Sequence, residues 1–292
     1  MKPRFLVLGS EGQLGRCLVR ALHHDRSLVG AYSHGELDIA DPRAVRDCLQ
    51  QVSSPCTVVN AAAFTAVDRC ETEVEMAYRV NRDAVEFVAQ ACLDSGLRLI
   101  HISTDYVFDG DSESPYAEDA AICPKSVYGK SKQAGEEIVL GASEDFLVVR
   151  SSWIFGPGKN FVEAILAQAR TRRADGDTSP LRVVDDQLGS PTYAADLAAG
   201  VLDLHDKGGR GLYHLANRGV ASWWDFARAI LDQAGEGALP IERVATASLD
   251  LPAPRPANSV LACERAEALG VVLRPWPEAL AAYLSSSDRR AA

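Results

Sequence analysis

The chain has 292 residues, of which 47 % are apolar and 24 % are charged. This length is enough for one large domain or two smaller ones, and the composition is that of an ordinary globular protein rather than a disordered one. The net charge of −10 and the acidic pI near 5.1 argue against a surface that binds nucleic acid or an anionic membrane.

The seven cysteines include no C-x-x-C pair, and their number is odd. This pattern favours reduced thiols over a disulfide framework or a zinc site, so we expect a cytoplasmic protein without a bound metal. The first residues are too poor in apolar side chains for a signal peptide, and no apolar run reaches the roughly 18 residues that a membrane span needs.

Short apolar runs alternate with helical patterns along the first half of the chain. The apolar runs predict strands at residues 4–9, 27–32, 57–63, 97–104 and 146–156. Apolar residues at helical spacing predict helices at 13–24 and through 74–96, and further helices that open near Pro42 and Ser126. Asp41 before Pro42 is an expected N-cap, and Gly96 an expected C-cap. The alternation predicts an α/β fold with a Rossmann-like, doubly wound parallel sheet.

The pattern changes after Gly156, where loops lengthen and the predicted helices at 192–207 and 222–235 stand apart. Ser222 and Asp225 have the spacing of a capping box at the start of the second of these helices. We therefore predict a dinucleotide-binding domain at 1–152 and a smaller C-terminal substrate-binding lobe at 153–292. Within the lobe, a segment at about 181–215 is expected to return to the sheet.

A glycine-rich turn, GSEGQLG at 9–15, joins the first predicted strand to the first predicted helix. Gly9, Gly12 and Gly15 would allow a tight turn, a close approach of the backbone to a pyrophosphate, and close packing of helix on strand. The helix N-terminus would then direct free N–H groups at the phosphates. The spacing is G-x-x-G-x-x-G, and its position at the start of a βαβ series favours dinucleotide binding over an ordinary surface turn.

The second predicted strand lacks the acid that usually follows it and binds the adenosine ribose of NAD. The chain reads Ser33-His34-Gly35 at this point, and a histidine leans only slightly toward the 2′-phosphate of NADP. Asp38 and Ile39 follow, where a carboxylate and an apolar side chain could contact the adenine edge. An ordinary turn before the next helix explains Asp38 and Ile39 equally well.

Further candidates lie where the later strands end, because ligands of a doubly wound sheet bind at the carboxyl ends of its strands. The third strand runs into three alanines, which keep side chains away from a flat ligand. The fourth ends in Ser103-Thr104-Asp105, which also suits an ordinary turn, and the fifth is followed by Trp153.

Tyr128 and Lys132 are four residues apart in SVYGKSKQAGEE, so they share one face of the predicted helix. A tyrosine hydroxyl with its pKa near 10 is a reluctant acid at neutral pH, and a nearby ammonium lowers that pKa. Such a pair is common on exposed helices, but the glycine turn and Thr104 favour a catalytic pair. Together these side chains could protonate a carbonyl oxygen while a hydride reaches its carbon.

These motifs resemble the extended short-chain dehydrogenase/reductase superfamily. More closely, residues 5–230 resemble the dTDP-4-dehydrorhamnose reductase family, and RPANSVLACERAEALGV continues the likeness more loosely. The likeness lies in the segments GSEGQLG, LDIAD, VVNAAAFTAVDRCE, STDYVFDG, VYGKSKQAGE, RSSWIFGPGKNF, VVDDQLGSPTYAADLA and GLYHLANRGVASWWDFA. The family's activity is reduction of the 4-keto group of dTDP-4-dehydro-L-rhamnose by NADPH or NADH.

The resemblance implies a role for each matching residue. Tyr128 would donate the proton, Lys132 would lower its pKa and hold the nicotinamide ribose, and Thr104 would hydrogen-bond the keto oxygen. The implied cofactor-binding residues are Gly9, Gly12, Gln13, Leu14, Gly15, Asp38, Ile39, Ala61, Ala63, Phe64, Thr65, Ile102, Tyr128 and Lys132. The implied substrate-binding residues are Thr104, Asp105, Trp153 and Arg255. NADPH is the expected cofactor with NADH as the alternative, the expected partner is a dTDP-sugar, and a homodimer is compatible with the sequence.

Three departures from the family pattern stand out. His34 stands where many members of the family carry an arginine, so the choice between NADPH and NADH stays open. SSW replaces the commoner TSW before Trp153, and Ile102 stands where an aromatic residue also occurs.

Three other functions share parts of this pattern. A sugar-nucleotide 4,6-dehydratase or 4-epimerase has the same fold, but dehydratases carry an acid after Thr-Asp where this chain has Tyr106. A reductase of a ring-contracted sugar, as in dihydrostreptose formation, would look nearly the same. A regulatory subunit of methionine adenosyltransferase binds the cofactor without known sugar chemistry, and the intact Thr104, Tyr128 and Lys132 favour an enzyme over it.

Overall fold

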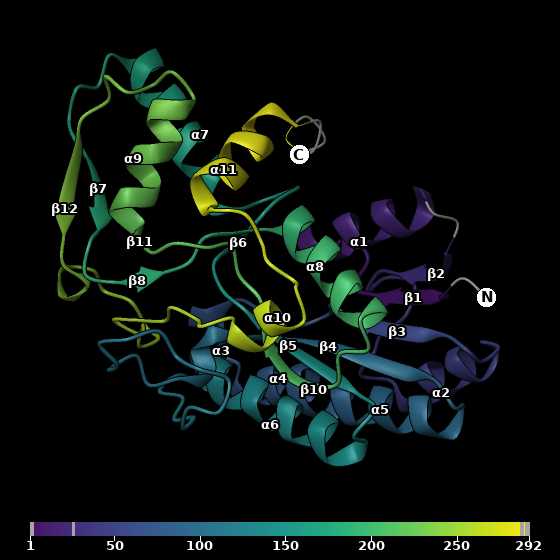
Figure 1. The fold of residues 1–292 in the computed structure, drawn as a ribbon. Helices are drawn as coiled ribbons and strands as arrows, with labels where there is room; N and C mark the ends of the chain where they lie inside the picture. The colour runs from purple at the N-terminus through teal and green to yellow at the C-terminus, as the bar shows by residue number, and fades with distance from the viewer. Residues whose placement is uncertain (1–2, 25–26, 287–288, 290–292) are drawn as a thin grey trace.

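Six parallel strands form the central sheet in a computed structural model that describes residues 3–24, 27–286 and 289 (Figure 1). The strand order is β10-β5-β4-β3-β1-β2. The strands are β1 (Phe5–Leu8), β2 (Leu28–Tyr32), β3 (Thr57–Asn60), β4 (Arg98–Thr104), β5 (Leu147–Ser151) and β10 (Gly211–His214). The predicted α/β class with a Rossmann-like parallel sheet is confirmed.

Helices cover both faces of this sheet because successive side chains of a strand point to opposite faces. Phe5 and Val7 pack with α1 (Gln13–His24) and α8 (Ala194–Asp206) on one face. Leu6 and Leu8 pack on the other face with α2 (Pro42–Gln50), α5 (Ala84–Asp94) and α6 (Val127–Ala142). Figure 1 shows these two helical layers above and below the strands.

The predicted helix at 74–96 is interrupted. It consists of α4 (Val74–Tyr78), a π-helical turn at Arg79–Asp83, and α5. The short helix α3 (Val67–Thr72) precedes it. The expected caps are present, because the Asp41 carboxylate accepts hydrogen bonds from the N–H groups of Arg43 and Ala44, and Gly96 takes a positive φ of 61°.

The predicted strand at 146–156 is also interrupted. β5 ends at Ser151, Trp153 turns away with a φ of 46°, and β6 (Ile154–Phe155) then pairs with β9 (Thr192–Tyr193). Trp153 stacks on Trp223, with ring centroids 3.6 Å apart and planes 5° from parallel. The segment predicted as one strand therefore contains a sharp turn at Trp153, whose ring packs against a ring of a helix distant in sequence.

A second group of elements lies beyond the carboxyl ends of the strands (Figure 1). Its aromatic core includes Phe155, Tyr193, Phe226 and Tyr283. The helices here are α7 (Phe161–Asp175), α9 (Trp223–Gln233) and α11 (Trp276–Ser285), and α10 (Glu264–Ala268) packs nearer the sheet. The remaining strands are β7 (Leu181–Val184), β8 (Leu188–Gly189), β11 (Ala221–Ser222) and β12 (Ile241–Val244).

The segment at 181–215 divides between the two parts. β7 pairs with β12 outside the main sheet, whereas β10 joins the sheet beside β5. The division into domains at residue 152 stays a prediction. Ser222 and Asp225 form the expected capping box at the start of α9. In the described part of the chain, no helix is both long and apolar enough to cross a membrane.

Candidate active site

The glycine turn between β1 and α1 has no room for side chains at two of its positions. Gly9 has a φ of +79°, and a Cβ on it would lie 2.7 Å from the backbone nitrogen of Ala62. A Cβ on Gly15 would lie 2.1 Å from the carbonyl oxygen of Gly9. The backbone of this turn is thus bare, as close contact with a pyrophosphate requires.

A cleft of about 420 Å³ opens beside this turn. The predicted cofactor residues that line it are Gly9, Gly12, Asp38, Ile39, Ala61, Ala63 and Phe64. The other predicted cofactor residues are not part of its lining, namely Gln13, Leu14, Gly15, Thr65, Ile102, Tyr128 and Lys132. The Oε1 atom of Gln13 is buried and has no hydrogen-bond partner among the described residues. A glycine turn without side chains, a cleft whose lining includes Gly9, Gly12 and the alanines after β3, and a buried unpaired acceptor fit a dinucleotide.

The end of β2 carries an acid that the sequence analysis missed. Glu36 folds back, and one of its carboxylate oxygens accepts hydrogen bonds from the N–H and the hydroxyl of Ser33, each 2.8 Å long. These bonds hold the pKa of Glu36 below its ordinary value. His34 is largely exposed, and its Nδ1 lies 3.8 Å from the Asp38 carboxylate. The Ser-x-x-Glu spacing was the available signal for this acid.

Tyr128 lies in the first turn of α6, which Ser126 caps by accepting a hydrogen bond from the Gly129 N–H. The tyrosine is 8 % exposed, and its ring meets that of Tyr106 edge-on. Burial raises the pKa of Tyr128 above its ordinary value, and a hydrogen bond with the Thr104 side chain acts in the opposite direction. The structure thus brings together the predicted proton donor and the predicted partner of the keto oxygen.

Two residues near Tyr128 do more than the sequence indicated. A Cβ on Gly129 would lie 2.2 Å from the Tyr106 carbonyl oxygen, so only glycine lets α6 approach the end of β4 this closely. The Ser131 hydroxyl donates to the Tyr128 carbonyl and accepts from Asn81 Nδ2. Asn81, in the π-helical turn, also bonds the backbone N–H and carbonyl of Phe64. It thereby joins the cofactor cleft to the catalytic helix.

Lys132 is buried beneath this site at 2 % exposure. Its ammonium donates to the Ile102 carbonyl over 2.7 Å and lies 3.2 Å from Nε2 of His101. Burial lowers the pKa of Lys132 to about 8, and the Glu136 carboxylate opposes that shift. Apart from burial, the groups that affect the Tyr128 pKa are Thr104, Asp105, Tyr106 and Cys70. Lys132 is not among them, so the predicted lowering of the Tyr128 pKa by Lys132 is not seen in this structure.

Comparison with known proteins agrees with this site. The family model described as "RmlD substrate binding domain" matches residues 3–289. This chain belongs to the RmlD family. It is 42 % identical to the spore coat polysaccharide biosynthesis protein SpsK of Bacillus subtilis, over 96 % of each chain. It is 39 % identical to the dTDP-4-dehydrorhamnose reductase of Mycobacterium tuberculosis H37Rv, over 98 % of this chain and 96 % of that one.

A solved structure is also similar. The dTDP-4-dehydrorhamnose reductase of Bacillus anthracis in complex with NADP matches with a TM-score of 0.89 and 33 % identity, over 97 % of this chain and 99 % of that one. The resemblance to the dTDP-4-dehydrorhamnose reductase family is therefore confirmed.

The predicted substrate residues of this RmlD family member have different partners within the chain. Thr104 donates to Asp105 Oδ1 over 2.9 Å, while Asp105 Oδ2 is buried without a partner among the described residues. Trp153 is held by its stack on Trp223. Arg255 Nη2 donates to both carboxylate oxygens of Asp68 in α3, over 2.9 and 2.8 Å, and Arg255 Nη1 donates to the Ala253 carbonyl. Its guanidinium is engaged by this chain's own carboxylate rather than left free for a diphosphate.

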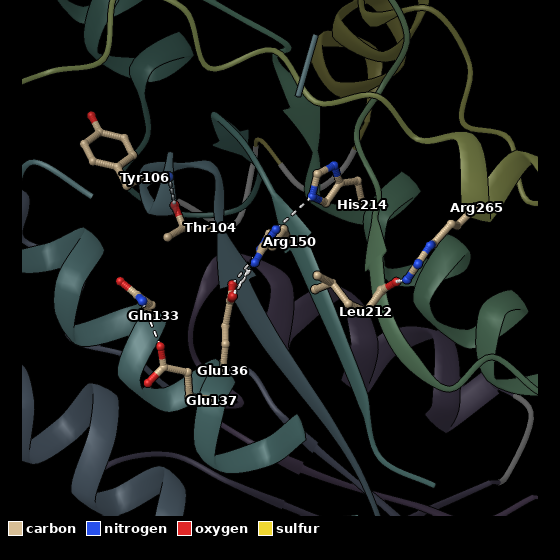
Figure 2. A network of polar contacts seen from close by, with 9 residues as sticks. All are labelled: Thr104, Tyr106, Gln133, Glu136, Glu137, Arg150, Leu212, His214 and Arg265. Atoms are coloured by element: carbon tan, nitrogen blue, oxygen red, sulfur yellow. Dashed lines mark hydrogen bonds and ion pairs between the residues drawn. The ribbon is translucent and has the colours of Figure 1, made fainter. Parts of the chain in front are cut away.

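A buried ion pair connects the catalytic helix α6 to strand β5 of the sheet (Figure 2). The Arg150 guanidinium donates three hydrogen bonds of 2.7 to 3.1 Å to the Glu136 carboxylate, and both side chains are at most 3 % exposed. Arg150 Nη1 lies 3.3 Å from Nε2 of His214. Burial and the Arg150 charge lower the pKa of His214 to about 3, so this imidazole is neutral. The network joins α6, β5 and β10.

The Asp105 carboxyl should make stability depend on pH. Burial raises its pKa from 3.8 to about 6, so the folded protein binds this proton more tightly than the unfolded chain. The resulting contribution to stability is complete below about pH 4 and is lost as the pH rises through about 6.

Over that range Asp105 alone should cost the protein about 3 kcal/mol of unfolding free energy. Asp105→Asn removes the titration. Urea unfolding of both proteins between pH 4 and 7 should show the variant gaining stability relative to wild type as the pH rises. A difference that does not change with pH would contradict this expectation.

Proposed function

We propose that this protein reduces the 4-keto group of dTDP-4-dehydro-L-rhamnose to give dTDP-L-rhamnose, with NADPH as the cofactor. The observation that carries this proposal is the buried pair of Tyr128 and Thr104 at the carboxyl edge of the sheet, next to a cleft that fits a dinucleotide. The family membership and the two reductase relatives support the same activity.

The residues of this chain act on the carbonyl oxygen. When bound, NADPH supplies the hydride that the carbonyl carbon receives. The Thr104 hydroxyl, which donates to Asp105 Oδ1 in this structure, would turn to donate a hydrogen bond to the keto oxygen, and Tyr128 transfers its hydroxyl proton to that oxygen. The raised pKa keeps Tyr128 protonated at neutral pH, as a proton donor must be. The Lys132 ammonium, one helical turn away on the same face, would stabilise the phenolate as it forms, although it does not act on the pKa of Tyr128 in the resting site. The phenolate takes up a proton from water before the next turnover.

The cofactor would lie along the glycine turn and the alanines after β3. Gly9, Gly12 and the N-terminus of α1 would hold the pyrophosphate, and Asp38 with Ile39 would contact the adenine. Lys132 would hold the nicotinamide ribose. The Glu36 carboxylate at the end of β2 is a group that disfavours a 2′-phosphate, so NADH is the cofactor to compare with NADPH.

The sequence after Thr104 favours simple reduction over dehydration. Tyr106, and not an acid, follows Asp105, and its ring packs against Tyr128. Burial raises the pKa of Tyr106, so it would not act as a base at neutral pH. The position after Asp105 thus supplies no base for an elimination of water.

The purified protein should consume NADPH when dTDP-4-dehydrorhamnose is added, as followed by the absorbance of the reduced nicotinamide. Mass spectrometry and NMR of the product should show dTDP-L-rhamnose. The same assay with NADH gives the ratio of kcat/KM for the two cofactors. Consumption of neither cofactor would refute the proposal, and consumption only with another dTDP-keto-sugar would reassign the substrate.

A further inference from the structure

A histidine lies inside the fourth strand, where the proposed mechanism uses no titratable group. His101 is fully buried, in a strand that also buries Leu99, Ile100 and Ile102. Its Nε2 lies 3.2 Å from the Lys132 ammonium. Its Nδ1 lies 3.4 Å from the amide nitrogen of Asn60, its neighbour in β3. The ring therefore sits between the catalytic lysine and the strand that runs into the cofactor cleft.

The imidazole must be neutral in this position. Burial and the adjacent Lys132 charge lower the pKa of His101 well below its ordinary value. A neutral imidazole has one nitrogen that donates and one that accepts. An ammonium can only donate, so Nε2 must be the acceptor and Nδ1 must carry the proton when Lys132 is charged.

The Asn60 amide weakly disfavours a proton on Nδ1 of His101. Asn60 Oδ1 accepts a hydrogen bond from the Ala62 N–H, which directs the amide nitrogen toward Nδ1 of His101. A donor at Nδ1 favours the other tautomer. The contact with Lys132 is shorter and charge-assisted, so it decides which nitrogen carries the proton.

We propose that His101 is a positioning residue for the reaction, whose Nε2 accepts a hydrogen bond from Lys132 and fixes the ammonium beneath the cofactor and Tyr128. The proposal rests on the proposed function. His101 and the Ile102 carbonyl are then two acceptors that hold the ammonium from neighbouring residues of β4. One donor of Lys132 stays available for the ribose.

Few titratable side chains lie close enough to the Lys132 ammonium to favour or disfavour its charged form. Among titratable side chains, His101 faces it from β4, and Tyr128 and Glu136 lie one turn away on its own helix. The Glu136 charge is met by Arg150 of β5. An acceptor that bonds the ammonium favours the charged form, so its removal lowers the lysine's proton affinity.

His101→Leu tests this role because leucine fills the space without accepting a hydrogen bond. We expect kcat to fall about tenfold, and the alkaline limit of the kcat/KM profile to move to lower pH by about one unit. His101→Gln supplies an oxygen acceptor and should restore both kcat and the alkaline limit toward wild type. His205→Leu is the matched control, because His205 bonds Thr57 at the opposite end of β3, and its profile should match wild type.

An unchanged alkaline limit in a folded His101→Leu would overturn the proposal, as would equal losses in the Leu and Gln variants. If the leucine variant fails to fold, ¹⁵N NMR of the wild-type imidazole decides the matter without substrate. Protonated Nδ1 and unprotonated Nε2 at neutral pH are expected, and protonated Nε2 would refute the hydrogen bond. Because this measurement needs no turnover, it also separates a failure of this proposal from a failure of the proposed function.

Discussion

Tyr128→Phe should lower kcat by about 10²- to 10⁴-fold and leave KM nearly unchanged, because it removes the only proton that the site delivers to the carbonyl oxygen. The phenyl ring keeps the edge-on contact with Tyr106, so the fold should be preserved. Steady-state kinetics with dTDP-4-dehydrorhamnose and NADPH measure the loss. Thermal unfolding of both proteins shows whether the fold is intact.

Tyr283→Phe is a matched control for this loss. Tyr283 is also fully buried, and its hydroxyl donates to Glu163 and accepts from Asn160 in the second group of elements, away from the cleft. Removal of this hydroxyl should affect stability and leave kcat close to wild type. Near-wild-type turnover in Tyr128→Phe, or an equal loss of kcat in the control, would refute the role of Tyr128 as proton donor.

The sheet and its two helical layers could be predicted because they depend on local pattern. Apolar runs such as FLVL at 5–8 pack against helices on both faces of the sheet, as the strands of a buried parallel sheet do. The glycine turn was also predictable, since Gly9 and Gly15 have no alternative at their positions. Tyr128, Lys132 and Thr104 followed from their places at the strand end and on one helix face.

The rest depends on contacts between residues far apart in sequence. Trp153 leaves the strand because Trp223, 70 positions later, supplies a stacking partner that no local pattern reveals. Asn81 lies in a stretch of ordinary helical pattern, and its role comes from contacts with Phe64 and Ser131. His101 looks like an isolated polar residue in a strand until Lys132 is placed beside it.

Arg150→Met should lower the free energy of unfolding by about 3 to 5 kcal/mol, because it leaves the Glu136 carboxylate buried without its partner. Methionine keeps much of the arginine's apolar stem, so the loss reports the charge rather than a cavity. The substitution should also remove the contact between Arg150 and Nε2 of His214. Nδ1 of His214 would keep its contacts with the carbonyls of Tyr116 and Ala262. Urea unfolding of Arg150→Met and wild type at neutral pH measures the difference in the free energy of unfolding.

A second substitution separates the cost of an unpaired charge from the value of the pair. In Arg150→Met with Glu136→Leu no buried charge remains, so the double variant should recover most of the stability that the single variant loses. Arg69→Met is the exposed control, since its pair with Glu73 is also bidentate but lies at the surface, and it should cost less than about 1 kcal/mol. A single variant no weaker than this control would contradict the prediction. A double variant no more stable than Arg150→Met would show that the pair holds α6 against β5 by geometry, beyond the neutralisation of a buried carboxylate.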